Sequence, residues 1–177
     1  MSGHARYDPV AGRAEPLPTT TIRPATRGDV PGLLAFDMTV VVRTEADWLD
    51  ALAKTERGER LLLVAEVAGE IAAFGQAHHL AEHPDDRAPA GWHLTGVTVL
   101  PRFRRGGLGR RLTQARLDWI AERSDLAWYM AAADNPASIR LHEQLGFVEV
   151  SRASSIHGVA FECGEGVLFR RRVTPDR

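Results

Sequence analysis

The segment VTVLPRFRRGGLGRRL, residues 97–112, limits the fold more than any other part of the chain. An apolar run that reads as a strand ends at Pro101, three glycines follow, and apolar residues then recur at helical spacing. A strand that turns through glycines into a helix is typical of α/β proteins. Such a turn exposes consecutive backbone N–H groups at a helix start, which favours a phosphate or pyrophosphate ligand.

Arginines surround this turn, and its glycine spacing excludes two common nucleotide motifs. The side chains of Arg104, Arg105, Arg110 and Arg111 can pair with phosphate oxygens. A P-loop requires Gly-Lys-Ser/Thr, whereas this chain has Gly-Arg-Arg. The G-x-G-x-x-G spacing of a dinucleotide site is also absent. On the turn alone, an arginine-rich helix start with ordinary turn glycines remains an alternative.

Hydrophobic periodicity and turn residues predict the element order β-α-α-β-β-β-α-β-α-β-β. Hairpins and helix crossovers alternate in this order, so we expect an α/β sandwich with a sheet of mixed direction. The expected strands are 19–23, 61–67, 71–80, 92–100, 126–133, 147–153 and 166–173, with helices near 30–36, 45–57, 108–120 and 136–145. Residues 1–18 are predicted to be a flexible tail, and residues 19–177 a single domain.

Composition restricts the environment and the partners. The chain has 177 residues, of which 44% are hydrophobic and 25% charged, with a formal net charge of -1. This balance is that of a globular domain and disfavours a nucleic-acid partner. The single cysteine, Cys163, is predicted to be a plain thiol and suits a reducing cytoplasm. No apolar run approaches the roughly 20 residues that span a bilayer, so no membrane partner is expected.

Two motifs resemble those of the GNAT family of N-acyltransferases. The segment RRGGLG, residues 104–109, fits the family pattern Q/R-x-x-G-x-G/A between a V-x-V-x-P strand and an amphipathic helix. The segment NPASIRLHEQLGF, residues 135–147, resembles the second block N-x-x-A/S-x-x-x-Y-x-x-x-G-F, with His142 at the tyrosine position. The resemblance covers residues 94–147 by motif and about 20–173 by element order.

The resemblance implies a fold and a donor. The fold is a mixed central sheet of about seven strands, with splayed parallel strands 4 and 5, flanked by about four helices. The donor is acetyl-CoA, with Gly96 as the bulge that opens the gap between the strands. The residues implied in CoA binding are Val97, Thr98, Val99, Arg104, Arg105, Gly106, Gly107, Leu108, Gly109, Arg110, Asn135 and Ser138.

The resemblance also implies direct attack of an amine on the thioester, which needs a base, an oxyanion donor and an acid. The oxyanion donor would be a backbone N–H near Val97. His142 is either the acid that protonates the thiolate or a residue that fills space beside CoA. The base is His93, Glu66 or an ordered water, with a structural histidine as the alternative reading of His93.

The acceptor is a primary amine whose identity stays open among small amines, amino acids, antibiotics and protein N-termini. Acidic residues that could attract a cationic amine are Asp37, Glu45, Asp47 and Asp50. Trp48 and Trp92 either line the acceptor pocket or belong to the core. No metal is expected, since His78, His79 and His83 read as a solvated strand end.

Two competing functions and one assembly are also considered. A GNAT-shaped module could bind acyl-CoA for regulation without turnover. A nucleic-acid binder could use the cluster Arg102–Arg116, although low net charge and the lack of a stacking pattern oppose it. A homodimer is the assembly to test.

Overall fold

The computed structural model describes residues 19–36 and 43–173. The predicted tail, residues 1–18, and the predicted acceptor residue Asp37 lie outside the described residues. The strands are β1 Thr20–Pro24, β2 Arg60–Val67, β3 Glu70–Leu80, β4 Gly91–Val99, β5 Leu126–Ala132, β6 Val148–Ala153, β7 Ser155–Ile156, β8 Val159–Ala160 and β9 Gly166–Arg172. The α-helices are α1 Val30–Leu34, α2 Glu45–Glu56, α3 Leu108–Ala121 and α4 Pro136–Gln144, with short 3₁₀ turns η1 Arg27–Asp29 and η2 Pro101–Phe103. No helix in the described ranges is long and apolar enough to cross a bilayer.

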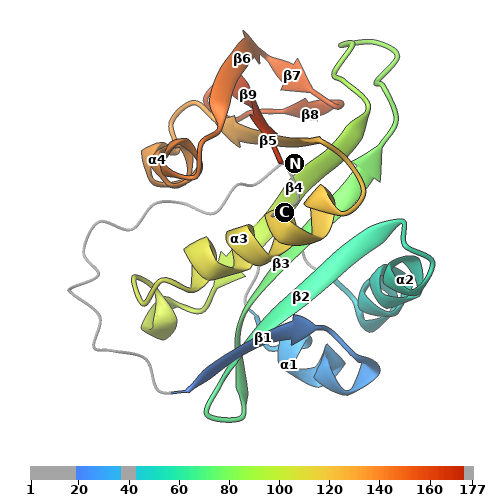
Figure 1. The fold of residues 1–177 in the computed structure, drawn as a ribbon, viewed down its shortest axis with the longest axis vertical. Helices are drawn as coiled ribbons and strands as arrows, with labels where there is room; N and C mark the ends of the chain where they lie inside the picture. The colour runs from blue at the N-terminus through green and yellow to red at the C-terminus, as the bar shows by residue number, and fades with distance from the viewer. Residues whose placement is uncertain (1–18, 37–42, 174–177) are drawn as a thin grey trace.

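Seven strands form one mixed sheet in the order β1-β2-β3-β4-β5-β9-β6 (Figure 1). β4 and β5 run parallel, and the other neighbours pair antiparallel. The predicted α/β fold, with parallel strands 4 and 5 and four helices, is confirmed. The small hairpin of β7 and β8 was not predicted, because two-residue strands carry no detectable period.

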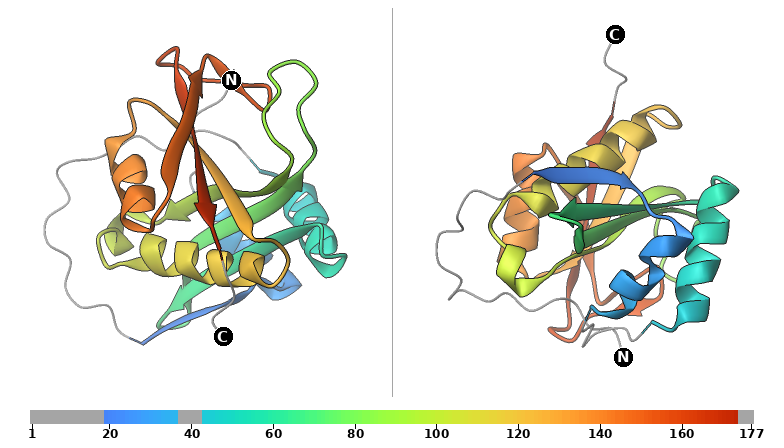
Figure 2. Two further views of the ribbon diagram at one scale, coloured as in Figure 1. Left: turned by 45° about the horizontal axis from the view of Figure 1, so that its top comes forward. Right: turned by 90° about the horizontal axis from the view of Figure 1, so that it is seen from below.

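One face of the sheet is covered by α3 (Figure 2). The helix buries Leu108, Leu112, Leu117 and Ile120 against alternate residues of the strands. These side chains are spaced by four, five and three residues, so they line one half of the helix surface. The packed stripe fixes the position of the helix start, where the glycine–arginine turn enters.

The opposite face is covered in two parts. α1 and α2 bury a cluster centred on Trp48 and Phe74, whose rings meet edge to face at a centroid distance of 5.1 Å. The β7–β8 hairpin covers the other part, where Ile156 and Phe161 pack on Leu168 of β9. Between these covers, polar residues of β2, β3 and β4 occupy the sheet face.

Candidate functional site

β4 and β5 separate partway along their length. They pair only over Trp92–Leu94 and Ala127–Tyr129, although β4 continues to Val99 and β5 to Ala132. Beyond Leu94, the backbone groups of β4 that face β5 have no strand partner among the described residues. We call this opening the β4–β5 split.

A bulge at Gly96 accompanies the split. The β3–β4 register passes from Gln76 opposite Thr95 to Phe74 opposite Thr98, so β4 contains one extra residue. Gly96 has φ +51°, and an added Cβ would lie 3.2 Å from the side-chain nitrogen of Gln76. Both facts favour glycine here. The bulge predicted at Gly96 is therefore confirmed.

A fully buried arginine lies beneath the bulge. Arg116 of α3 donates from Nη1 to the carbonyls of Gln76, at 2.8 Å, and Thr95, at 3.3 Å. Its other bonds go to the carbonyl of Leu112 and the hydroxyl of Thr113, and no described carboxylate pairs with it. Burial lowers its pKa to about 9, so it remains charged at neutral pH. Arg116 thus links α3 to β3 and to β4 next to the bulge.

The glycine–arginine turn, residues 104–110, places backbone N–H groups that no side chain caps beside the split. Gly107 is the N-cap of α3 with φ +82°, and no side chain caps the helix. Apart from its chain neighbours, a Cβ added at Gly107 would meet no atom of the described residues within 4 Å, so these residues leave the space beside the helix start open. Arg104 donates from Nε to the carbonyl of Val99, while Arg105 and Arg110 are exposed. This arrangement can bind an anion.

α4 approaches the same place from the second half of the sheet. An added Cβ at Gly109 would lie 3.9 Å from the side chains of both Val97 and Leu141, so α3, β4 and α4 converge there. Asn135 caps α4 by accepting the N–H of Ser138, and the Ser138 hydroxyl bonds the hydroxyl of Tyr129. Both predicted CoA residues therefore have local structural roles.

His142 stacks flat on Tyr129, with ring centroids 3.5 Å apart. Its Nδ1 lies 2.8 Å from the carbonyl of Ser138, so Nδ1 carries the proton and donates it. Nε2 is then an acceptor, and it is buried with no hydrogen-bond partner among residues 19–36 and 43–173. Burial lowers the pKa of His142 to about 4, which keeps the ring neutral at pH 7. A neutral ring in this tautomer cannot donate from Nε2.

His93 points to the face opposite α3 and is buried. Its Nδ1 donates to the carbonyl of Gly91, and its Nε2 lies 3.0 Å from Nε2 of His157, which turns in from the β7–β8 hairpin. Burial lowers the pKa of His93 to about 4. The Nε2 of His157 also lies 3.1 Å from the carbonyl of Pro89, so its one proton is shared between Pro89 and His93. The ring of His93 is fully buried, and its Nε2 faces His157.

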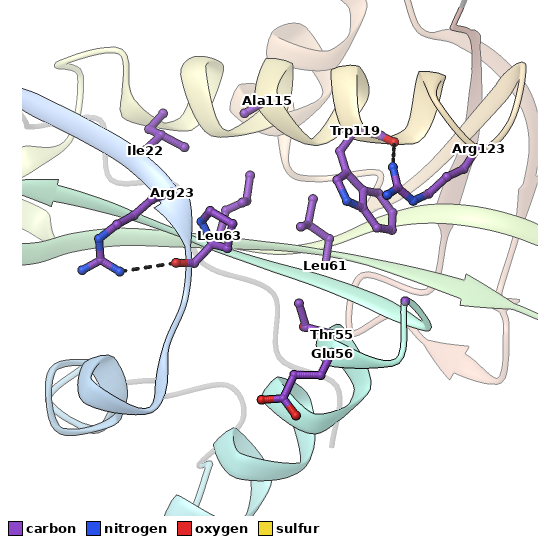
Figure 3. A pocket seen from close by; sticks show the side chains of 11 residues that line it. Ile22, Arg23, Thr55, Glu56, Leu61, Leu63, Ala115, Trp119 and Arg123 are labelled. Carbon is purple, nitrogen blue, oxygen red and sulfur yellow. Dashed lines mark hydrogen bonds between the residues drawn. The ribbon is translucent and has the colours of Figure 1, made fainter.

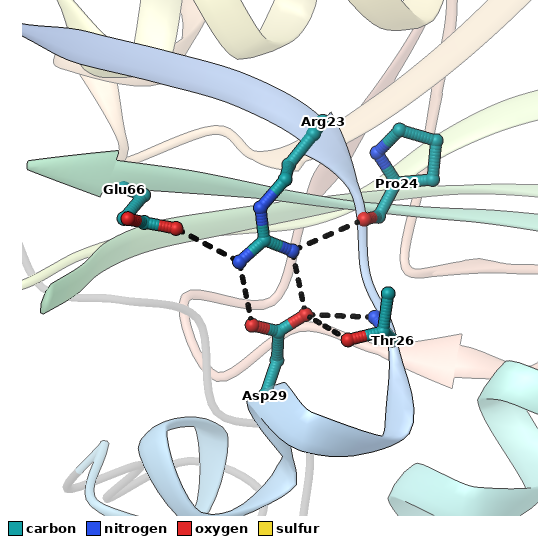
Figure 4. Close-up of polar contacts among 5 residues, drawn as sticks. All are labelled: Arg23, Pro24, Thr26, Asp29 and Glu66. Carbon is teal, nitrogen blue, oxygen red and sulfur yellow. Dashed lines mark hydrogen bonds and ion pairs between the residues drawn. The ribbon is translucent and has the colours of Figure 1, made fainter. Parts of the chain in front are cut away.

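Glu66 lies on β2, two strands from β4, and is held by an ion pair (Figure 4). Arg23 donates to Glu66 at 2.9 Å and to both oxygens of Asp29. Asp29 also caps the turn by accepting from Thr26, and the bond with Arg23 lowers the pKa of Asp29 to about 2. The structure does not bring Glu66 to the split, because its carboxylate fastens η1 to the sheet edge.

Two of the predicted acceptor carboxylates, and both predicted tryptophans, are engaged elsewhere. Asp47 accepts from the backbone and hydroxyl of Thr44 as a helix cap, and Asp50 pairs with Lys54. Glu45 is exposed in the first turn of α2. Of the two tryptophans, Trp48 is fully buried in the α2 cluster, and Trp92 packs edge to face on Trp119 in the α3 core. Both tryptophans are core residues.

His78 corrects the reading of a solvated strand end. Arg60 approaches its Nδ1 at 3.4 Å, Gln76 lies at its Nε2, and burial lowers its pKa to about 3. His79 is exposed, and His83 contacts Asp86. Within the described residues, no group of three metal-ligating side chains is arranged to hold an ion.

A shallow cavity of about 420 Å³ lies away from the split (Figure 3). It is bounded by the β1–β2 edge, the end of α2 and the α3 side chains Ala115, Trp119 and Arg123. The Arg123 guanidinium stacks on the Trp119 ring at 3.7 Å. None of the predicted site residues lines this cavity, so it does not enter the site.

The buried neutral histidines predict a loss of stability in mild acid. Unfolded histidines titrate near pH 6.5, whereas His93 and His142 do so near pH 4 in the folded state. Between these values the unfolded chain binds more protons, so stability falls as the pH drops from 6.5 toward 4. We expect urea unfolding at pH 5 to show a loss on the order of 2 kcal/mol per histidine relative to pH 7.

The controls are single substitutions. His142→Phe should keep only part of this pH dependence, and replacement of the exposed His79 by Gln should keep all of it. Equal stability at pH 5 and pH 7 would contradict the neutral, buried state of both rings.

Comparisons with known proteins agree with this geometry. Residues 31–147 match the model of the acetyltransferase (GNAT) family. A mycothiol acetyltransferase of Salinispora arenicola is 31% identical over 111 residues, which are 62% of this chain and 33% of that protein. An L-methionine sulfoximine/L-methionine sulfone acetyltransferase of Pseudomonas paraeruginosa is 31% identical over 145 residues, 73% of this chain and 80% of that protein. The chain thus spans a third of the first relative and four fifths of the second.

A solved structure has the same fold. The phosphinothricin acetyltransferase of Sinorhizobium meliloti, in complex with acetyl-CoA, superposes with a TM-score of 0.71 at 17% identity. The match covers 88% of this chain and 89% of that one. The family model covers more than half of the chain, and the fold and the split agree with it. The chain therefore belongs to the acetyltransferase (GNAT) family.

Proposed function

We propose that residues 19–177 act as one domain that transfers an acyl group, acetyl first, from acyl-CoA to a primary amine. The observation that carries this proposal is the β4–β5 split beside an uncapped, glycine-rich helix start. An elongated ligand with a pyrophosphate at one end and amides along its length matches both features. The relatives named above are acetyltransferases, which supports acetyl as the group transferred.

The donor would be held mainly by backbone groups. Its pyrophosphate would accept hydrogen bonds from N–H groups between Arg104 and Arg110, with Gly106, Gly107, Leu108 and Gly109 allowing close approach. Its pantetheine amides would pair with the main chain of Val97, Thr98 and Val99, where β4 lacks a neighbour on the β5 side. Asn135 and Ser138 would support this site by fixing the start of α4.

The reaction we propose is direct attack of the neutral amine on the thioester carbonyl. A C–N bond forms, the C–S bond breaks, and the amine proton leaves as the thiolate gains one. The Val97 N–H, which the bulge separates from the regular β3–β4 ladder, would stabilise the oxyanion. Proton removal is assigned to ordered water on the polar face, since the candidate bases His93 and Glu66 are bonded to other residues.

For the acid, we propose Tyr129 rather than His142. Burial raises the pKa of Tyr129 to about 12, so the phenol keeps its proton at neutral pH. The assignment requires that the Ser138 hydroxyl donates to the phenol oxygen, which leaves the phenol proton for the thiolate. His142 would need a second proton, and its pKa near 4 makes that form scarce. We infer that His142 positions Tyr129 by stacking.

This assignment predicts the pH dependence of kcat. If protonated His142 were the acid, kcat would fall about tenfold per pH unit above pH 4. We expect no such fall between pH 6 and pH 8 in steady-state kinetics with acetyl-CoA. Tyr129→Phe should lower kcat at least tenfold, an effect of about 1.4 kcal/mol, and His142→Ala should lower kcat more than it raises the KM for acetyl-CoA.

Two outcomes would contradict the assignment. A steady fall of kcat with rising pH would restore His142 as the acid. An unchanged kcat in Tyr129→Phe would remove the phenol from the reaction, and an unchanged kcat in His142→Ala would remove its positioning role.

The test of the function is a calorimetric titration with CoA, followed by an amine panel with acetyl-CoA that reads free thiol. Binding followed by release of thiol supports the transferase. Binding with no release for any amine supports a regulatory acyl-CoA module instead. Failure to bind CoA contradicts both. Nucleic-acid binding that survives saturating CoA would revive the third function, although Arg116 of its proposed cluster is buried.

We further propose that the protein is cytoplasmic and forms a homodimer. The free thiol of Cys163 is exposed, which suits a reducing compartment. Sedimentation of the full chain with and without CoA measures the assembly.

A further inference from the structure

Two half-buried arginines lie on the sheet face opposite α3. Arg43 precedes α2, with its guanidinium 5.0 Å from the centroid of the Trp48 ring, and Arg60 begins β2. Neither forms an ion pair with any residue of the described ranges. The Nε atom of Arg43 is buried and has no hydrogen-bond partner in the part of the chain that the structure describes.

The two charges are close enough to affect each other. Burial lowers the pKa of both side chains, and the charge of Arg43 lowers that of Arg60 further. The neighbouring carboxylates serve other groups, because Asp47 caps α2 and Asp50 pairs with Lys54. Among the described residues these two partly desolvated cations have no ion-pair partner, and Asp47 and Asp50 attract them without forming an ion pair, so a bound anion would offset part of the cost of their burial.

The arginines belong to a row of side chains that leads to the β4–β5 split. Arg60, His78, His93 and Trp128 are register partners on β2, β3, β4 and β5, so they share one face. The His93–Trp128 pair lies one residue before β4 and β5 part. His78 is neutral and accepts from Arg60, so the row presents its positive charge at the α2 end.

The row meets β4 at His93, close to where the split begins. Arg60 already reaches the ring of His78 on β3, and β4 is the next strand, about 4.8 Å further. An amine that carries an anionic group nearby could bind that group at the arginines and extend its nitrogen toward the split. A long or purely cationic amine would gain nothing from these charges.

We propose that Arg43 and Arg60 bind a carboxylate of the acceptor, so that the acceptor is an amino acid or a similar amino carboxylate. This inference rests on the proposed transferase function. It replaces the expectation that acidic residues around α2 attract a cationic amine, since Asp47 caps α2 and Asp50 pairs with Lys54. Arginine suits the role because its planar fork matches a carboxylate with two parallel hydrogen bonds.

The experiment compares L-amino acids with their carboxamides, which keep the amine and the side chain but lose the negative charge. Leucine, methionine, phenylalanine and glutamine, each with its amide, are assayed with acetyl-CoA by thiol release. We expect the accepted acid to exceed its amide by about 10- to 100-fold in kcat/KM, because hydrogen bonds to a charged group are worth about 1.5–3 kcal/mol. Arg60→Gln and Arg43→Gln should each remove most of this preference, because they should lower the rate with acids far more than the rate with amides.

Arg57→Gln is the matched control. Arg57 lies just after α2, is exposed and pairs with Glu59, so this variant removes a nearby charge outside the row. It should keep the preference for acids, and Arg60→Lys should keep part of it. Circular dichroism and CoA titration of each variant establish that the fold and the donor site persist.

A second measurement is independent of turnover. N-acetyl amino acids and their amides are titrated into the CoA-saturated protein by calorimetry, and the acids should bind at least tenfold more tightly. Equal rates or equal binding for acids and amides would overturn the carboxylate site while leaving the transferase intact. Binding of neither product would overturn it as well. Failure of the protein to bind CoA would instead overturn the proposed function.

Discussion

Gly107→Asp is expected to lower the affinity for CoA by at least about 100-fold, or about 2.7 kcal/mol. Gly107 is the N-cap of α3, and the space that its Cβ would enter contains no atom of the described residues within 4 Å apart from its chain neighbours. In the proposed complex that space holds the pyrophosphate. A carboxylate there would occupy the anion position and repel the ligand's charge.

The control separates this effect from backbone strain. Gly58 has φ +74°, close to the +82° of Gly107, and an added Cβ there also meets nothing within 4 Å. Gly58→Asp should therefore cost a similar stability, about 1 kcal/mol, and leave CoA affinity unchanged in calorimetry. Equal CoA affinity in the Gly107 variant and the wild-type protein would remove the turn from the donor site.

Arg116→Met is expected to destabilise the protein by about 2–4 kcal/mol and to lower kcat. Methionine fills a similar volume and removes the cost of burying a charge. It also removes hydrogen bonds to three carbonyls and to Thr113, and bonds to a charged donor are worth about 1.5–3 kcal/mol each. The lost bonds outweigh the relieved desolvation. Because two of them hold the strands beside Gly96, the oxyanion donor should also lose its fixed position.

Urea unfolding tests the predicted loss of stability, and steady-state kinetics on the same variants test the predicted loss of kcat. Arg111→Met changes an exposed arginine of the same helix and should shift stability by less than about 0.5 kcal/mol. Arg116→Lys should restore some stability and little of kcat, since a lysine cannot reach the four acceptors with one rigid fork. If Arg116→Met unfolds at the same urea concentration as the wild-type protein, the proposed fastening role of Arg116 is wrong.

The fold could be predicted because its signals are local. Gly96 interrupts a strand pattern where the chain needs a positive φ, and the glycine turn follows within a few residues. The helix stripes of α3 are periodic, so their faces follow from spacing alone. Strand ends agreed to within one or two residues, as the period changes sharply at Pro and Gly.

The site was less predictable, because it depends on contacts between distant residues. Arg116 resembled its exposed arginine neighbours in the sequence, yet it sits on the buried stripe of α3 beneath the bulge. His93 finds its partner 64 residues away, in a hairpin too short to detect. Arg60 and His78 meet only through the β2–β3 register. Glu66 was a candidate base because carboxylates can accept a proton, and only the fold reveals that it is ion-paired with Arg23.

With the donor bound in the β4–β5 split as proposed, the three-residue pairing between β4 and β5 would link the stability of the protein to its donor supply. Two parts of the sheet, β1–β4 and β5–β9–β6, are joined by a short ladder, and the strand groups beyond it are left for a ligand to complete. A donor that pairs along Val97–Val99 would finish the sheet as a further strand would. By mass action, each increase in free donor above its dissociation constant would then raise the free energy of unfolding. A cell rich in acyl-CoA would hold more of this protein intact than a starved one, with no change in its synthesis.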